Sequence, residues 1–352
     1  MADYGAEAER RASTKGESRD EGAAYEVVPA TAQVGHEWPR QRQGIVGVEG
    51  VQRRIGMDVG VVVPQGWTGE YDGWDARRAW ERTVAVARQA ERLGFESIWV
   101  FDHLHTVPQP IDELTFESFT TLAALAALTE RVRLGHVVVC TAFRNPALTA
   151  KMIGTLDVVG GGRMELGLGA GWKEDEWRAY GYGFPDTKTR LATLADHLEV
   201  ITRMLGPGHA TYAGRYASVR DAINVPRGIQ EPRVPVIVGG NGPNVTWRLA
   251  ARHADELNLD CLEPDEIPAA LAVIRSRCEE IGRDPATLRV SVNIGRDVFG
   301  ATGAARVKLL AAYRDLGIAR VMGLLHASAT SDGALESLAE DARAAGCTLF
   351  GA

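Results

Sequence analysis

Short runs of β-branched residues alternate with longer amphipathic stretches from Met57 to the end of the chain. The short runs have the length and composition of buried strands, and we expect eight of them, at residues 57–63, 97–102, 131–139, 163–169, 234–240, 255–260, 288–294 and 319–325. The longer stretches repeat apolar residues at helical spacing, most clearly over 75–94, 115–130, 189–205, 264–282 and 303–317. Eight strands, each followed by a helix, predict an α/β fold of the (β/α)8 TIM-barrel type.

Two regions depart from this alternation. About 64 residues separate the fourth and fifth expected strands, which predicts an insertion after strand four. Within it, residues 210–219 alternate polar and apolar side chains around Ala213-Gly214, a pattern typical of a β-hairpin. Residues 1–54 are rich in Ala, Gly, Glu, Arg and Ser and show little periodicity, so we expect a disordered N-terminal extension. The barrel domain then covers residues 55–352.

Composition and charge exclude several classes of function. The net charge is −7 and the sequence has no basic block, so we expect no nucleic-acid partner. No apolar run approaches the roughly 18 residues of a membrane span. The four cysteines, at positions 140, 261, 278 and 347, form no C-x-x-C pair, which argues against a zinc site and suits a reducing cytoplasm. We therefore expect a cytoplasmic protein with no metal site and no membrane contact.

The segment LGLGAGWKEDEWRAYG, residues 166–181, superficially resembles a dinucleotide-binding loop. Its third glycine comes one residue early for the pattern G-x-G-x-x-G, and Trp172 occupies the sixth place. We interpret the segment as the end of the fourth strand, where glycines let a planar ligand lie against the backbone. The acidic residues 174–176 that follow would repel a phosphate, so we expect none there.

The end of the fifth strand carries the clearest signal for an anion. Active sites of such barrels lie at the C-terminal ends of the strands. There, Gly239, Gly240, Asn241 and Gly242 precede a helix expected to begin near Pro243. Glycines let the backbone approach a phosphate closely, and a helix N-terminus offers unpaired N–H groups. A tight turn is the alternative, but it requires one glycine rather than three in four residues.

The second strand ends in Asp102-His103. This pair can orient a cofactor or substrate and exchange a proton with it, so we take both as candidate catalytic residues. The alternative is a hydrogen-bonded pair that closes the barrel mouth without chemistry. Cys140 and His326 also follow strands, but packing explains each of them better.

Loops around the same face would form the substrate pocket. We expect Trp67, Trp74, His105 and Trp172 to line it, because they follow the first, second and fourth strands. Each tryptophan taken alone is more often a residue of core or lid packing.

Three blocks, residues 93–104, 131–181 and 235–258, resemble signature segments of the luciferase-like monooxygenase superfamily, in order and at family spacing. They are most similar to its branch of oxidoreductases that depend on the deazaflavin coenzyme F-420. The resemblance implies a (β/α)8 barrel, a flavin-like tricycle at the strand ends and a homodimer.

The resemblance also implies roles for individual positions. Asp102 and His103 match the pair beside the cofactor ring, and the third-strand segment often carries a non-proline cis peptide behind the deazaflavin. The matching cofactor-binding positions are Asp102, Val137, Val138, Val139, Gly169, Ala170, Gly171 and the phosphate-loop residues Gly239, Gly240 and Asn241. Two places depart from the pattern. Trp172 stands where sugar-phosphate dehydrogenases of this branch keep a catalytic glutamate, which argues against a sugar-phosphate substrate. Val139-Cys140 replaces a frequent threonine-glycine pair, so the cofactor contacts of the third strand are expected to differ in detail.

The resulting hypothesis is an oxidoreductase that transfers a hydride between F-420 and a small organic molecule. The alternative within the fold is an FMN-dependent monooxygenase that uses FMNH2 and O2. A non-catalytic flavin-binding protein is a third reading, because a fold does not guarantee a function.

Overall fold

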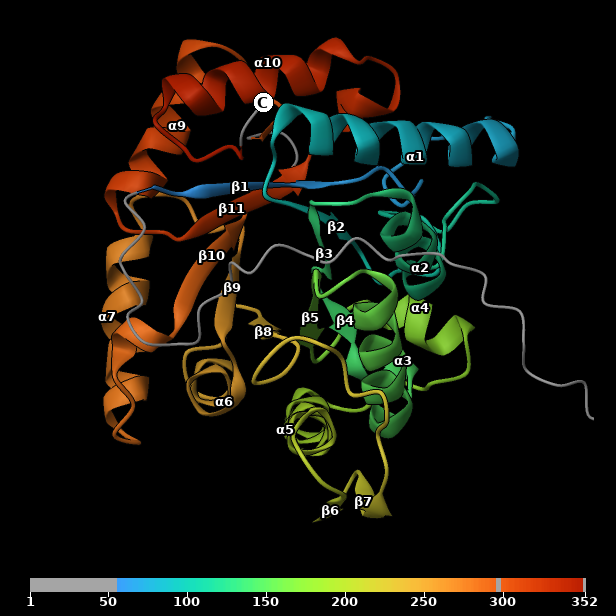
Figure 1. The fold of residues 1–352 in the computed structure, drawn as a ribbon, viewed down its shortest axis with the longest axis vertical. Helices are drawn as coiled ribbons and strands as arrows, with labels where there is room; N and C mark the ends of the chain where they lie inside the picture. The colour runs from blue at the N-terminus through green and yellow to red at the C-terminus, as the bar shows by residue number, and fades with distance from the viewer. Residues whose placement is uncertain (1–55, 296–298, 351–352) are drawn as a thin grey trace, which may run out of the picture. The chain divides into compact units, whose positions relative to one another are not determined.

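The computed structural model describes residues 56–295 and 299–350. The expected disordered extension, residues 1–54, lies outside the described residues. Within them the chain alternates strands and helices in the order that the sequence pattern predicts (Figure 1).

Eight parallel strands close into a barrel. Around the barrel they are β3 (Arg133–His136), β2 (Ser97–Val100), β1 (Asp58–Val62), β11 (Arg320–Leu324), β10 (Arg289–Asn293), β9 (Glu256–Asp260), β8 (Val236–Gly239) and β5 (Met164–Gly169). β3 and β5 pair with each other and complete the ring. Each lies within one of the eight expected strands, so the TIM-barrel prediction is confirmed.

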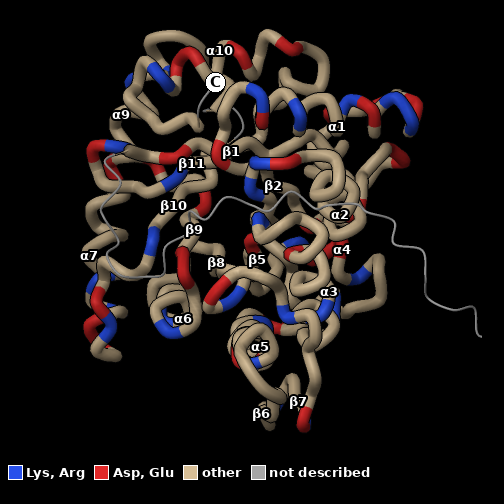
Figure 2. Tube along the Cα trace, viewed as in Figure 1, with Lys and Arg blue, Asp and Glu red and all other residues tan. Residues whose placement is uncertain are grey.

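Helices surround the barrel and cover its outer surface (Figure 1). They are α1 (Ala76–Leu93), α2 (Ser118–Leu128), α3 (Pro146–Val159), α4 (Glu174–Ala179), α5 (Thr187–Leu205), α6 (Thr246–His253), α7 (Ile267–Glu279), α9 (Ala304–Asp315) and α10 (Gly333–Ala344). α1 shows why they form. Asp75 caps its N-terminus by accepting from the backbone of Arg78, and Gly94 ends it at φ 88°. Basic and acidic residues intermingle on outer helices such as α1 and α7 (Figure 2).

The barrel interior is packed with side chains. Trp99 of β2 lies inside, and Gly60 and Gly135 on the flanking strands leave room for it. A Cβ at Gly60 would lie 2.6 Å from the indole nitrogen. Val62, Ile237 and Met322 fill the remaining space. The interior is therefore solid core, and a ligand can bind only at an end of the barrel.

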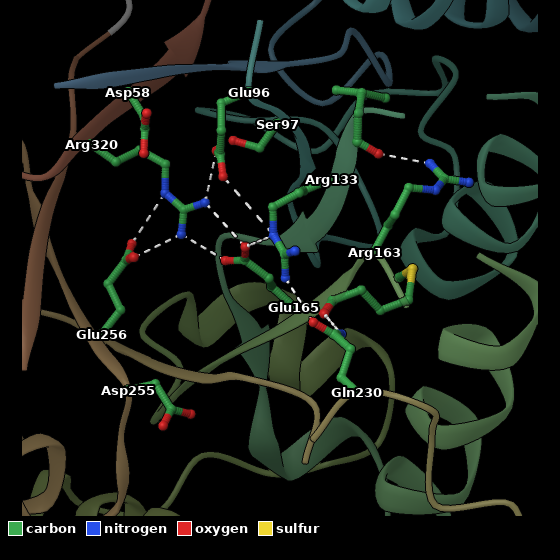
Figure 3. A network of polar contacts seen from close by, with 12 residues as sticks. Asp58, Glu96, Ser97, Arg133, Arg163, Glu165, Gln230, Asp255, Glu256 and Arg320 are labelled. Carbon is green, nitrogen blue, oxygen red and sulfur yellow. Dashed lines mark hydrogen bonds and ion pairs between the residues drawn. The ribbon is translucent and has the colours of Figure 1, made fainter. Parts of the chain in front are cut away.

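The N-terminal ends of the strands hold a buried cluster of charges (Figure 3). The Arg320 guanidinium is fully buried and donates to Glu96 at 2.9 Å, to Glu165 at 2.6 Å and to Glu256 at 2.7 Å. Arg133 also donates to Glu165. Burial alone would raise the pKa of Glu165, but Arg320 and Arg133 outweigh it and hold that pKa well below its usual range. These charges close the amino end of the barrel.

The insertion follows β5, as expected. It contains α4, α5 and an antiparallel hairpin of β6 (Ala210–Ala213) and β7 (Ser218–Ala222), which confirms the predicted hairpin. An isolated two-stranded hairpin is marginally stable in water. Here the Asp196 carboxylate of α5 accepts hydrogen bonds from the Tyr212 hydroxyl at 2.7 Å and the Tyr216 N–H at 2.6 Å. The hairpin is therefore anchored to α5.

Candidate functional site

A cavity of about 970 Å³ opens at the C-terminal ends of the strands. Pockets for drug-sized ligands range from about 300 to 1,000 Å³, so this one has room for a cofactor and a small substrate. Strand ends and the insertion supply most of its walls. Among the lining residues are Trp67, His103, Val137, Val138, Val139, Gly169, Ala170, Gly171, Trp172, Gly239, Gly240 and Asn241.

Val138 forms part of the cavity wall between two short strands. The Val137–Val138 peptide is cis, as the family resemblance implies for this segment, and it separates β3 from β4 (Val139–Cys140). The Val138 side chain occupies the space that side chains on the neighbouring strands would need. A Cβ would lie 2.9 Å from it at Gly167, 2.7 Å at Gly169 and 2.8 Å at Gly239. These glycines therefore leave room for Val138, and at Gly167 a Cβ would also lie 2.1 Å from the His136 carbonyl oxygen. The contact of a planar ligand with the strand-end glycines stays a prediction.

Gly171 is required for a different reason. Its φ is 77°, and a Cβ there would lie 2.6 Å from the Cys140 sulfur and 2.6 Å from the Trp177 ring. Burial, with a further effect of the Asp102 carboxylate, raises the pKa of Cys140 to about 12. The Cys140 side chain is therefore a neutral thiol that packs in the wall, as the sequence predicts.

Asp102 lies in the cavity wall, but its carboxylate is fully engaged by protein groups. Arg144 donates to both oxygens, at 2.7 and 2.9 Å. The Ser118 hydroxyl donates at 2.7 Å and the backbone N–H of Cys140 at 3.0 Å. Asp102 thus joins the end of β2 to β4 and to α2. Such a bidentate pair fixes geometry as well as charge.

The ring of His103 is held by two other residues. The Trp67 indole stacks on it, with centroids 4.2 Å apart and an interplanar angle of 6°. Its Nδ1 lies 3.0 Å from Oε2 of Glu176, and the other Glu176 oxygen accepts from the Leu104 N–H at 2.6 Å. A carboxylate at Nδ1 fixes the ring orientation and leaves Nε2 to exchange a proton. The partner of His103 is therefore Glu176 and not Asp102.

Glu176 belongs to the acidic run that the sequence suggests as the start of a loop. In the structure this run is the first turn of α4. Glu174 pairs with Arg178 and Asp175 with Lys173, while Glu176 is buried. Sequence reasoning missed Glu176 because three consecutive acidic residues look alike in the sequence. Only the way the helix packs decides which of them is buried.

The glycine segment after β8 lies in the cavity wall, as expected, but α6 begins at Thr246 and not near Pro243. The Asn241 side chain links this segment to β9, because it donates to the Asp260 carbonyl at 2.7 Å and accepts from the Asp260 N–H at 2.9 Å. A Cβ at Gly242 would lie 2.7 Å from the Thr246 hydroxyl. Thr246 also lines the cavity, so the first turn of α6 faces the ligand space.

Two residues expected in the substrate pocket lie outside the cavity wall. Trp74 packs against Tyr71, with centroids 5.4 Å apart, and the Arg78 guanidinium covers its ring at 4.2 Å. His105 directs Nδ1 to the carbonyl of Thr106 at 3.0 Å. Local contacts of their own loops hold both rings away from the cavity. Trp67 and Trp172 do line it, and the Trp172 side chain is 64% exposed.

Residues of the insertion complete the wall, and sequence reasoning did not single them out. Trp177, Thr187, Arg190 and Leu191 all face the cavity. In the described residues, no group of three or more His, Cys, Asp and Glu side chains is arranged to hold a metal ion. No helix there is long and apolar enough to cross a membrane.

Comparison with known families places the chain. Residues 57–347 match the family described as luciferase-like monooxygenase. The chain belongs to the luciferase-like monooxygenase family. The match covers every strand of the barrel and nearly all of the described residues.

Similar members of the luciferase-like family bear names that mention F420 or a pterin. An "F420-dependent glucose-6-phosphate dehydrogenase" of Kineococcus radiotolerans is 35% identical over 48% of this chain and 49% of its own length. A "5,10-methylenetetrahydromethanopterin reductase" of Methanolobus tindarius is 28% identical over 63% of this chain and 64% of its own. The aligned part thus spans about half to two thirds of these curated relatives.

Solved structures of the same fold extend over more of the chain. An F420-dependent secondary alcohol dehydrogenase, in complex with an F420–acetone adduct, superposes with a TM-score of 0.70 at 18% identity, over 82% of this chain and 99% of its own. The coenzyme F420-dependent tetrahydromethanopterin reductase of Methanopyrus kandleri superposes with a TM-score of 0.63, also at 18% identity, over 81% and 97%. At this identity the likeness establishes the fold.

Proposed function

We propose that the chain is an oxidoreductase that transfers a hydride between F-420 and a small organic substrate. The observation that carries the proposal is the His103–Glu176 pair. The pair lies at the wall of a cavity that also contains the apolar surface around Val138, which suits a tricyclic cofactor. The names of several relatives support the choice of cofactor.

The residues present fit F-420. Val138 and the side-chain-free positions around it offer a smooth apolar surface for a planar ring system. The Gly240 N–H already donates to the Asn258 carbonyl and the Trp247 N–H to the Gly242 carbonyl, both at 3.0 Å. The backbone N–H groups of Asn241, Gly242 and Thr246 are the ones that would reach a phosphate. When bound, the deazaflavin supplies the carbon that accepts or donates a hydride.

The protein's own groups have distinct tasks. Nε2 of His103 would hold or accept the proton that accompanies hydride transfer, and Glu176 would keep the imidazole oriented. Asp102 would position the backbone of β4 and, through it, the Val138 side of the cavity. Trp67 and Trp172 would exclude water and contact the substrate. Because Trp172 replaces the glutamate expected for sugar-phosphate oxidation, we propose a substrate other than glucose 6-phosphate.

The experiment that tests the proposal compares two cofactors. Fluorescence titrations with F-420 and with FMN should give an affinity for F-420 at least about tenfold higher. The absorbance of bound F-420 should then change when alcohols, aldehydes or unsaturated carbonyl compounds are added. Tighter binding of FMN, with consumption of O2 in the presence of FMNH2, would instead identify a flavin monooxygenase. Binding without turnover of any compound would identify a carrier.

We also propose a homodimer, as the family resemblance implies, and a cytoplasmic location, which the widely separated cysteines suit. Light scattering of the purified full chain measures the mass directly. A mass equal to the 38.0 kDa of one chain would contradict the dimer.

A further inference from the structure

The first turn of α5 presents one face to the cavity. Thr187, Arg190 and Leu191 all line it, and their spacing of three and four residues places them on one side of a helix. Of the three, only Arg190 carries a charge. α5 begins after Asp186, whose carboxylate caps the helix by accepting from the Thr189 N–H at 2.8 Å.

The Arg190 guanidinium is held in a fixed plane. It lies over the Phe184 ring, 4.1 Å from the centroid. One terminal nitrogen donates to the Pro185 carbonyl at 2.6 Å and the other to the Thr187 hydroxyl at 3.2 Å. Its Nε is buried and has no hydrogen-bond partner. A buried donor without a partner costs free energy, and this cost is removed when a ligand accepts from it.

Arg190 also lacks a counter-charge. Among the described residues, no carboxylate lies within ion-pair distance of Arg190. The exposed Asp186 is the nearby acidic residue, and its pKa is lowered mainly by hydrogen bonds from Thr189 and to a smaller extent by Arg190. The carboxylates that line the cavity are already bonded: Asp102 to Arg144, Glu176 to His103 and Asp260 to Asn293. The ammonium of Lys173, the other Lys or Arg side chain among the described lining residues, pairs with Asp175.

We infer that Arg190, with the Thr187 hydroxyl, binds an anionic group, a carboxylate or a phosphate, of a ligand held in the cavity. A guanidinium fixed on an aromatic ring offers planar donors that match such a group. Phe184 packs edge-on against Trp177, with centroids 5.4 Å apart, and Trp177 follows Glu176 in α4. The subsite therefore lies on the side of the cavity from which the partner of His103 comes. The anion belongs either to the substrate or to the acidic tail of F-420.

The first arm of the test needs no cofactor. Tryptophan fluorescence of the full chain is titrated with benzoate and with inorganic phosphate, for wild type, Arg190→Met, Arg190→Lys and Arg178→Met. Arg190→Met should weaken binding at least about tenfold and Arg190→Lys less, because it keeps the charge but not the planar fork. Arg178→Met is the matched control in the same insertion: its guanidinium is exposed and paired with Glu174, so binding should stay within about twofold of wild type.

The second arm, which rests on the proposed function, identifies the source of the anion. F-420 and its deazaflavin core without phosphate and tail are titrated against the same variants. If Arg190→Met weakens the binding of F-420 but not that of its core, the anion is in the tail of F-420. If it weakens the binding of benzoate but of neither cofactor form, the anion is in the substrate. Absence of binding of both cofactor forms to wild type overturns the proposed function and leaves the first arm intact. The subsite is overturned if Arg190→Met, with an unchanged thermal midpoint, binds every probe within about twofold of wild type. It is also overturned if the wild type binds neither benzoate nor phosphate.

Discussion

Asp102 and Glu176 are buried carboxylates with different roles. Asp102 adjoins His103 in the sequence, yet Arg144, Ser118 and the backbone of Cys140 use its oxygens. Glu176 comes from the insertion and forms the hydrogen bond to the His103 ring. Adjacent residues on the end of a strand point in different directions, so the partner of His103 depends on how the insertion packs.

His103→Ala should leave the affinity for F-420 within a few-fold of wild type and lower turnover by about a hundredfold or more, the usual scale of general acid–base assistance. Glu176→Gln should lower turnover less, because the amide can still hold the ring in place. Glu174→Gln is the control, since that carboxylate pairs with the exposed Arg178. Single-turnover absorbance of F-420 measures each rate. Wild-type turnover in His103→Ala with cofactor bound would show that the protein donates no proton.

His136, the last residue of β3, predicts a pH dependence of stability. Its ring is fully buried against Phe119, 4.2 Å between centroids, and both nitrogens lack partners. Burial lowers the pKa of His136 from 6.5 to about 4. Between these values the unfolded chain binds a proton that the folded chain does not, so stability is complete above pH 6.5 and falls as the pH decreases toward 4.

At about 1.4 kcal/mol per pH unit, this loss reaches about 3 kcal/mol. In His136→Leu the free energy of unfolding, measured in urea at a series of pH values, should therefore decrease less across this interval. Part of the slope should remain, because burial also lowers the pKa of His197 to about 4. The exposed His326→Gln should keep the wild-type slope. Equal slopes in His136→Leu and wild type would contradict the prediction.

At the scale of elements, local patterns were sufficient to predict the strands and the hairpin. The β-branched runs are local, so all eight strands could be placed from the sequence. The break between β3 and β4 at Val137–Val138 has no periodic signal and was expected only from the family resemblance. α6 begins later than expected because Asn241 ties the preceding segment to the backbone of Asp260. Glu176 was missed because its contacts with His103 and Leu104 join segments that are distant in the sequence. Arg190 was missed because its own contacts are local and only the tertiary fold places it at the cavity.

The first turn of α6 offers a test of the phosphate loop. Thr246→Glu and Thr246→Gln differ only in charge. The affinity for F-420 should be at least about tenfold lower in Thr246→Glu than in Thr246→Gln, because the added carboxylate would face the phosphate. The thermal midpoint should hardly differ, since an acidic side chain is favourable at a helix N-terminus. Asn244→Asp adds the same charge two residues earlier, outside the cavity wall, and should bind F-420 nearly as wild type does. Equal affinities of the glutamate and glutamine variants would show that the phosphate binds elsewhere.

At the scale of the whole barrel, the two ends of the strands have separate functions. The amino ends contain the Arg320 cluster, and the carboxyl ends form the cavity. The packed interior around Trp99 lies between them. Substitutions at the amino end should therefore change stability without changing ligand affinity.

Arg320→Met should lower the free energy of unfolding by about 3–5 kcal/mol, because it leaves buried carboxylates without their partner. At low concentrations of denaturant, where the variant stays folded, its affinity for F-420 should match that of wild type. Arg77→Met is the control, because that side chain is 80% exposed and its ion pair with Glu81 contributes only about 0.5 kcal/mol. Urea unfolding and a cofactor titration give the two quantities. A large loss of affinity in the folded variant would show that the two ends are coupled.

Val138 and the glycines that surround it constrain how this sequence can diverge. A larger side chain at Gly169 or Gly239 collides with Val138, and a smaller one at position 138 leaves a void that no glycine can fill. Substitutions at these positions are therefore not independent, and their energetic effects should be strongly non-additive. Lineages that change residue 138 should carry a compensating change on β5 or β8. Positions 138, 169 and 239 therefore have to be varied together when this cavity is reshaped, whereas Gly167 is also restricted by the His136 backbone carbonyl.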